Sequence, residues 1–247
     1  MKFAVISDIH GNMEALNAVM ENIEKSNCEK IFALGDYAMA GAEPDVAIDW
    51  IMENQAKKNL TLIQGNTDKM IVEYSPTLYE DLKENSPVMA EALRYDYQNI
   101  NPIQRAFLKD LPPQAEAEIQ GVKFLFVHGS PRRNNEDIMP DTPIEEVQKM
   151  VEGINANIVL CGHTHIPCGF QTNKQQTVVN VGSVGRSMFE DGKACYLEIT
   201  VHNGQCLFEH KFIEYDRETT VAKLKKRKFV GVEKIISAIL KPEERHF

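Results

Sequence analysis

Short apolar runs recur along the chain, and five of them end at a small residue or a turn that is followed by a polar side chain. These runs cover residues 3–7, 31–34, 60–64, 124–127 and 158–161. Their length and their content of Val, Ile, Leu and Phe are typical of buried strands in an α/β sheet. In such sheets ligands bind just beyond the carboxyl ends of the strands, so the residues after each run are candidates for chemistry.

Helical spacing separates the first three runs. Asn12 suits a helix N-cap, and the apolar residues after it fall on one helical face: Met13, Leu16, Val19, Met20 and Ile23. Pro44 suits the first turn of a second helix that would bury Val46, Ile48, Trp50 and Ile51. Alternation of strand and helix over residues 2–64 predicts right-handed parallel crossovers.

Residues 69–111 form a helical but irregular segment, broken by Pro76, Pro87 and Pro102. The segment is inserted between two site-bearing strands. It can therefore overhang the site as a lid or a specificity wall, or simply pack on the edge of the sheet.

The later part of the chain reads as antiparallel. Gln120-Gly121 predicts a hairpin turn. Alternating segments then follow at 168–172, 176–181, 194–201 and 206–213, which predicts an antiparallel meander. A C-terminal helical tail is expected over 217–247, with helix from Val221 to Leu240. Parallel units followed by antiparallel strands suggest two packed sheets with outer helices, and we expect a single domain over residues 1–247.

Composition narrows the class of protein. The net charge of −9 counts against a general nucleic-acid binder, and 43% hydrophobic residues support a packed core. A basic cluster in the tail (Lys223, Lys225, Lys226, Arg227 and Lys228) is either a solvated helix face or a surface for an acidic partner. Five Cys without framework spacing do not indicate disulfides. We find neither a signal-like apolar stretch at the start nor a membrane-length run, and we expect a cytoplasmic location.

Metal-binding side chains follow all five runs. They are Asp8, His10, Asp36, Asn66, His128, His163 and His165. Singly, each has an ordinary explanation: an Asp can cap a helix, an Asn can hold a turn, and a lone His can be a core residue. Together, at successive strand ends, they predict a metal site, and one with two ions. Mixed nitrogen and oxygen ligands without thiolate suit Mn, Fe, Zn, Co or Ni better than Ca or Mg.

The order of these motifs resembles that of the calcineurin-like metallophosphoesterases. The family pattern is Asp-x-His, Gly-Asp, Gly-Asn-x-Asp, His-Gly and Gly-His-x-His, and all five blocks stand here between residues 8 and 165. The segment 180–185 resembles the family's Asn-x-Gly-Ser. The resemblance covers roughly residues 2–200 and implies a four-layer α/β/β/α sandwich of two mixed sheets with the site at their rims.

Carried over by position, the resemblance implies two metal-binding groups. The first ion would be held by Asp8, His10, Asp36 and His165, and the second by Asp36, Asn66, His128 and His163. Asp36 would bridge them. The implied reaction is hydrolysis of a phosphate ester by a hydroxide that bridges the ions. Asp36, Asn66, His128 and His10 are then the candidate catalytic residues.

The sequence departs from the family pattern in two places. Many members carry His after the Asn of the third block as a general acid, and here Thr67 stands there. A Thr hydroxyl is too weakly acidic for that task. We expect Asp68 to be structural, since its usual imidazole partner is missing. The protein phosphatase branch has an Arg where this chain has Ala40. The missing charge could come from three arginines, which could equally form structural salt bridges: Arg132, Arg133 and Arg186. With Thr67, these are the candidate substrate-binding residues.

Several functions remain open at this point. The leading hypothesis is a dinuclear metal-dependent phosphoesterase that acts on a phosphodiester or a small nucleotide, with a small phosphorylated molecule as its partner. Alternatives are a protein phosphatase, a nuclease, or a scaffold that retains the metal site with little catalysis. The sequence does not determine the substrate, the metal or the oligomeric state.

Overall fold

The computed structural model of the chain describes residues 1–189 and 191–241. Its strands are β1 (Lys2–Ile6), β2 (Lys30–Ala33), β3 (Leu60–Leu62), β4 (Gln114–Ile119), β5 (Val122–Val127), β6 (Ile158–Cys161), β7 (Cys168–Gln171), β8 (Thr177–Asn180), β9 (Ala194–His202) and β10 (Gln205–Ile213). Its helices are α1 (Met13–Lys25), α2 (Pro44–Asn54), α3 (Asn66–Val72), α4 (Pro76–Asn85), α5 (Pro87–Asn99), α6 (Pro102–Asp110), α7 (Ile144–Met150), α8 (Arg217–Leu224) and α9 (Val232–Leu240).

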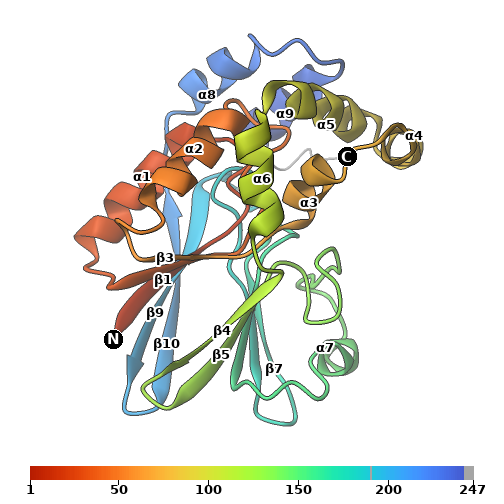
Figure 1. The fold of residues 1–247 in the computed structure, drawn as a ribbon. Helices are drawn as coiled ribbons and strands as arrows, with labels where there is room; N and C mark the ends of the chain where they lie inside the picture. Colours follow the sequence, from red (N-terminus) through yellow and green to blue (C-terminus); the bar gives the residue numbers. More distant parts are fainter. Residues whose placement is uncertain (190, 242–247) are drawn as a thin grey trace.

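The strands form two mixed sheets of five strands each. The order in the first is β10-β9-β1-β2-β3, and in the second β4-β5-β6-β8-β7. The pairs β1–β2 and β2–β3 are parallel, as the strand–helix alternation predicted. Figure 1 shows α1 and α2 along the outer side of the first sheet and α7 outside the second. The predicted α/β/β/α sandwich is confirmed.

Alternation along the strands assigns each side chain to a layer. Phe3 and Val5 of β1 lie in the core between the sheets, where Phe3 packs edge-on against Phe124 of β5 with ring centroids 5.4 Å apart. Ala4 and Ile6 of the same strand face the core under the helices. On the far side, the outer face of the second sheet packs against α7 in a third, smaller core. Three apolar interfaces therefore hold four layers together.

Local signals fix several boundaries as expected. The Asn12 side chain caps α1 by accepting a hydrogen bond from the backbone N–H of Ala15. Gln120 and Gly121 both have positive φ and join β4 to β5 as an antiparallel hairpin. Cys161 is fully buried in β6.

Two expectations about helix packing and strand pairing are wrong. Val46 of α2 is 42% exposed, because Ala47, Ile48 and Ile51 form the buried face of that helix instead. The late strands are not one meander: β7–β8 is a hairpin in the second sheet, where β8 pairs parallel with β6. β9–β10 is a hairpin in the first sheet, where β9 pairs with β1.

The tail is two helices and not one. α8 and α9 are separated by a turn that ends at Gly231, whose φ of 89° is left-handed. Within the basic cluster, Lys223 forms ion pairs with Glu14 and Glu43, and Arg227 with Asp96. The other three residues of the cluster are exposed. The last six residues of the predicted tail lie outside the described residues.

The inserted segment 69–111 contains the end of α3 and helices α4 to α6. α5 approaches the loops of the site, where Asp96 accepts a hydrogen bond from the backbone N–H of Ala40, and Met89 contacts Arg186. Among the described residues, no helix is long and apolar enough to cross a membrane.

Candidate metal centre

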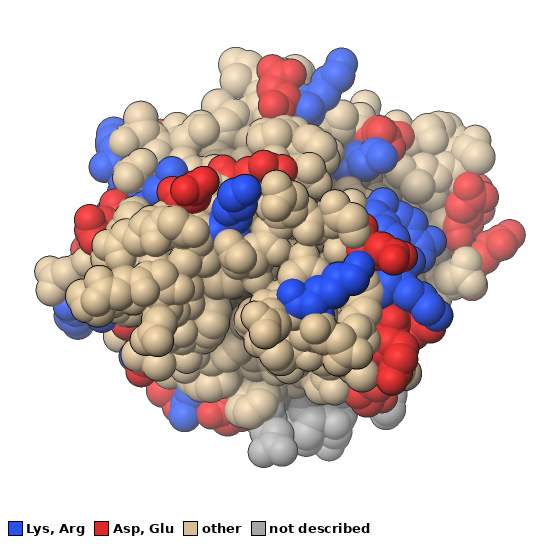
Figure 2. All heavy atoms as spheres, turned by 90° about the horizontal axis from the view of Figure 1, so that it is seen from below, with Lys and Arg blue, Asp and Glu red and all other residues tan. Residues whose placement is uncertain are grey.

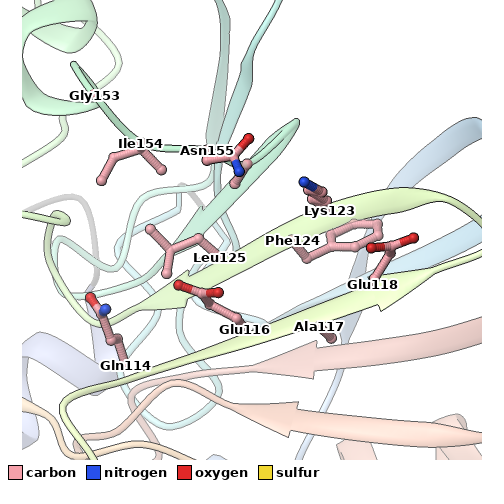
Figure 3. Close-up of a pocket in the computed structure, with 11 residues that line it drawn as sticks. Gln114, Glu116, Ala117, Glu118, Lys123, Phe124, Leu125, Gly153, Ile154 and Asn155 are labelled. Atoms are coloured by element: carbon pink, nitrogen blue, oxygen red, sulfur yellow. The ribbon is translucent and has the colours of Figure 1, made fainter.

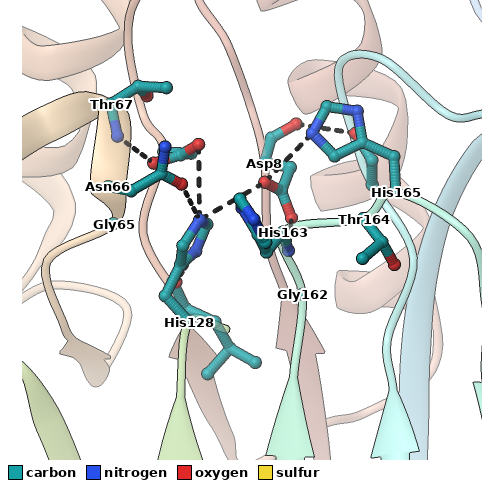
Figure 4. A network of polar contacts seen from close by, with 12 residues as sticks. Asp8, Gly65, Asn66, Thr67, His128, Gly162, His163, Thr164 and His165 are labelled. Carbon is teal, nitrogen blue, oxygen red and sulfur yellow. Dashed lines mark hydrogen bonds and ion pairs between the residues drawn. The ribbon is translucent and has the colours of Figure 1, made fainter. Parts of the chain in front are cut away.

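The seven predicted ligands gather where the carboxyl ends of strands from both sheets meet. Loops after β1 and β2 bring Asp8, His10 and Asp36 from one sheet, and Asn66 lies at the start of α3, which follows β3. Loops after β5 and β6 bring His128, His163 and His165 from the other. Figure 4 shows His128 and Asn66 directed toward each other, with His165 directed at Asp8. Most of the cluster is buried, since five of the seven residues are at most 7% exposed: Asp8, His10, Asp36, His128 and His165.

The backbone of the cluster is strained. Twelve described residues other than glycine have positive φ, and five of them are predicted ligands: Asp8, His10, Asp36, His163 and His165. A left-handed residue with a side chain costs about 1–2 kcal/mol. Hydrogen bonds maintain these conformations, among them those from the Asp8 N–H to Gly35 O and from the His10 N–H to Asp36 O. Strain concentrated in this way is typical of functional sites.

His10 and His165 present lone pairs to each other. The Nδ1 of His10 lies 3.0 Å from Met39 O, and the Nδ1 of His165 lies 2.9 Å from Arg186 O. A carbonyl oxygen can only accept a hydrogen bond, so each Nδ1 carries a hydrogen and donates a hydrogen bond. In the neutral ring, Nε2 then has no hydrogen and presents its lone pair. The two Nε2 atoms are 3.2 Å apart. Burial lowers the pKa of His10 to about 3, so it stays neutral near pH 7. Two facing lone pairs repel unless a cation lies between them.

His128 is oriented in the same way. Its Nδ1 lies 2.7 Å from Leu34 O, and its Nε2 lies 2.9 Å from Asn66 Oδ1 and 3.3 Å from Asp36 Oδ2. Burial disfavours the charged imidazole, but the charge of Asp36 outweighs this and raises the pKa of His128 to about 10. The surroundings of this nitrogen thus favour a positive charge, which a proton or a metal ion can supply.

The two carboxylates lie between the histidines. Asp8 Oδ1 accepts no hydrogen bond although it is fully buried, and it faces His165 Nε2 at 3.2 Å. Burial opposes ionisation of Asp8, yet the nearby His165 and His128 lower its pKa to about 2. A buried, ionised oxygen that accepts no hydrogen bond and faces imidazole nitrogens requires a positive charge close to it, which a cation bound at this point would supply.

Two overlapping groups have ligand atoms close enough to share an ion. One is Asp8, His10 and His165, and the other is Asp8, Asp36 and His128. Asp8 belongs to both groups, whereas we expected Asp36 to be the shared carboxylate. Asp36 Oδ2 nevertheless lies 3.7 Å from His10 Nε2. Both carboxylates are therefore placed between the two groups.

Thr67 and Asp68 hold Asp36 and its turn in place. The backbone N–H of Thr67 donates to Asp36 Oδ1 at 2.9 Å, and its buried hydroxyl contacts Ala38 O. The Asp68 carboxylate accepts from the backbone N–H groups of Asp36, Tyr37 and Gly65. Asp68 therefore holds the turn that carries Asp36, which confirms the structural role expected for it.

The comparison with known proteins agrees with this geometry. Residues 1–204 match the sequence model of the calcineurin-like phosphoesterase superfamily domain. The chain belongs to that superfamily. It is also 29% identical to an uncharacterized protein of Methanocaldococcus jannaschii, over 91% of this chain and 92% of that protein.

Solved structures show the same fold. A hypothetical protein from Pyrococcus horikoshii OT3 superposes with a TM-score of 0.88 at 23% identity, covering 99% of both chains. A metallophosphoesterase from Sphaerobacter thermophilus superposes with a TM-score of 0.79 at 19% identity, covering 98% of this chain and 100% of that one.

The three candidate arginines lie in different settings. Arg132 and Arg133 are exposed and both pair with Glu136, so their contacts are those of a loop salt bridge. Arg186 is 7% exposed, and burial lowers its pKa to about 10 although the charges of Asp36 and Asp8 favour its charged form. Of the three, Arg186 is the one buried beside the cluster.

Sequence reasoning noted the segment 180–185 but assigned no role to its side chains. Asn180 donates to Gly162 O and to Thr164 Oγ1, and the Ser183 hydroxyl donates to Asp8 O. The segment that resembles Asn-x-Gly-Ser therefore holds two ligand-bearing loops in place. Asp137 was also missed. Its carboxylate lies 3.1 Å from His163 Nε2. Nothing in the sequence distinguishes this residue from other exposed acidic residues in loops.

A separate pocket lies away from the cluster. It has a volume of about 460 Å³ and is formed by β4, β5 and the loop after α7. Figure 3 shows its polar lining, which includes Glu116, Glu118 and Lys123. None of the seven predicted ligands lines it, so the candidate chemistry resides in the strand-end cluster.

Proposed function

We propose that this protein is a dinuclear metal-dependent phosphoesterase that hydrolyses a phosphodiester or a small nucleotide. The observation that carries the proposal is the buried convergence of imidazole Nε2 atoms on the carboxylates of Asp8 and Asp36. Four His, two Asp and one Asn would hold two ions chosen from Mn, Fe, Zn, Co or Ni. Such ions would lower the pKa of a shared water and offset negative charge on the phosphoryl oxygens.

The residues of the chain contribute fixed charge and orientation. Asp36 is aligned by the Thr67 N–H, and the histidine tautomers by backbone carbonyls. Arg186 adds a buried positive charge beside the cluster, suited to an anionic substrate. Asn66 and His163 are less buried than the other five predicted ligands, so we infer that substrate approaches on their side.

Two observations favour a small substrate over a phosphoprotein or a nucleic acid. Ala40 is buried and its N–H is bonded to Asp96, so the position of the phosphatase arginine offers no cation. The net charge of the chain is −9, and on the one face seen in Figure 2 acidic and basic side chains are interspersed, without a continuous basic groove. Nucleic-acid binding usually requires such a groove.

The test is hydrolysis by the manganese-reconstituted protein of bis-p-nitrophenyl phosphate, p-nitrophenyl phosphate, cyclic nucleotides and dinucleoside polyphosphates. We expect turnover of the diester to exceed that of the monoester. Changing a residue that only contacts a metal ligand costs up to roughly 100-fold in affinity or activity. Asp36→Asn changes a predicted ligand itself, so it should lower kcat/KM by more than that. Asp81→Asn, which removes an exposed carboxylate on α4, is the control. Metal binding without turnover of any of these esters would instead identify a scaffold.

A further inference from the structure

His163 differs from the other three histidines of the centre in how its ring is held. His10, His128 and His165 each place Nδ1 against a backbone carbonyl and direct Nε2 at the cluster. The Nε2 of His163 instead lies 3.1 Å from the carboxylate Oδ1 of Asp137. The nitrogen left for the cluster is then Nδ1.

The backbone of His163 is fixed, but its ring is not enclosed. The residue has a φ of 67°, and its N–H donates to Asp8 Oδ2 at 3.0 Å. Its ring centroid lies 5.3 Å from that of His128, so the ring borders the second group. The side chain is 18% exposed, more than that of His10, His128 or His165. Without a partner, such a ring could rotate or exchange tautomers.

The loop that carries Asp137 is anchored on both sides of it. Glu136 is held by Arg132, Arg133 and the Ser130 hydroxyl. Ile138 is 1% exposed, and its carbonyl accepts from the hydroxyl of Thr164, the residue after His163. The loop is thus docked on the turn that carries His163. This docking keeps the Asp137 carboxylate beside the His163 ring, although the Asp137 side chain is 69% exposed.

We propose that Asp137 is a positioning residue that accepts the Nε2–H of His163 and turns the Nδ1 lone pair toward the second ion. A carboxylate that receives the outer N–H of a ligand histidine fixes its tautomer and makes the other nitrogen a better donor. The ion-binding part of this inference rests on the proposed function, whereas the tautomer does not.

The experiment uses the full chain with ¹⁵N-labelled histidine. Long-range ¹H–¹⁵N spectra of the metal-free protein should show His163 protonated at Nε2 in the wild type and in Asp137→Asn, whose amide oxygen can still accept. Asp137→Ala should give a mixture of tautomers. Asp141→Ala removes another exposed acid of the same loop and should leave the wild-type tautomer.

Manganese titration of the same variants supplies the second readout. Asp137→Ala should weaken binding of one of the two ions by roughly 10–100-fold and leave the other unchanged. Wild-type tautomer or wild-type affinities in Asp137→Ala overturn the inference, as does an Nδ1-protonated His163 in the wild type. A wild-type protein that binds no ion but shows the Nε2–H tautomer would refute the proposed function and the ion-binding half of the inference.

Discussion

The Nε2 atoms of His10 and His165 lie 3.2 Å apart in the core of the centre, with the opposite nitrogen of each ring committed to a backbone carbonyl. Neither ring can turn its Nε2 away without losing that contact. The fold therefore holds in place an arrangement that is unfavourable until a cation is present. Ion binding and folding should be linked for this reason.

The first prediction concerns this linkage. Manganese at about 100 times the dissociation constant of a site should raise the free energy of unfolding by about 2.7 kcal/mol for that site. The gain should fall in His165→Leu, which removes one of the two lone pairs. Urea unfolding with and without manganese measures both effects. An equal gain in wild type and variant would show that His165 does not bind the ion.

The second prediction follows from Thr67. Its buried hydroxyl cannot act as a general acid, so the rate should depend steeply on leaving-group pKa, with aryl esters cleaved far better than alkyl esters. Thr67→His should flatten that dependence, because a general acid contributes roughly 10²–10⁴-fold where the leaving group is poor. The measurement is kcat/KM over a series of aryl and alkyl phosphodiesters.

Two points decide how that series is interpreted. Thr67 is only 5% exposed, so a larger side chain can disturb Asp36, and the metal content of the variant must be measured first. Equal slopes in both proteins would mean that another residue already supplies the proton, with His10 or a residue of segment 69–111 as the candidates.

The third prediction concerns pH and stability. Burial opposes ionisation of Glu136, but hydrogen bonds from Arg132, Ser130 and Arg133 outweigh it and lower its pKa from 4.5 to about 2. The stabilisation is therefore present above about pH 4.5 and lost as pH falls toward 2. The free energy of unfolding of Glu136→Gln should approach that of the wild type across this window. A difference that does not change with pH would contradict the assignment.

The sequence predicted the layers of the fold and the edge at which the candidate ligands gather, but it did not predict the pairing of the late strands. The ligands follow buried apolar runs, and parallel strands place their carboxyl ends at one edge, so Asp8 and Asp36 meet by simple geometry. The pairing of β8 with β6 and of β9 with β1 depends on contacts distant in sequence, which local alternation does not encode. The positions of the strands and the two-sheet architecture were therefore predicted, whereas the division of the late strands between the sheets was not.

The contacts that orient the histidine rings were the least predictable part of the centre. Backbone carbonyls such as Leu34 O orient the histidines, and no residue type marks them. Asp137 reaches His163 because Ile138 is buried and bonded to Thr164, a contact between separate loops. The helix predicted from Val221 to Leu240 is broken before Gly231, whose left-handed φ precedes α9.

The central claim is that two ions bind in one centre, and metal analysis of the manganese-reconstituted protein tests it most directly. Protein purified without chelator, reconstituted and freed of loose ions should contain two transition-metal ions per chain. Asp36→Asn should contain fewer, while Cys161→Ser should keep both because its thiol is buried in β6. A reproducible stoichiometry of zero in a folded wild-type protein would contradict the account, and a stoichiometry of one would contradict the dinuclear centre.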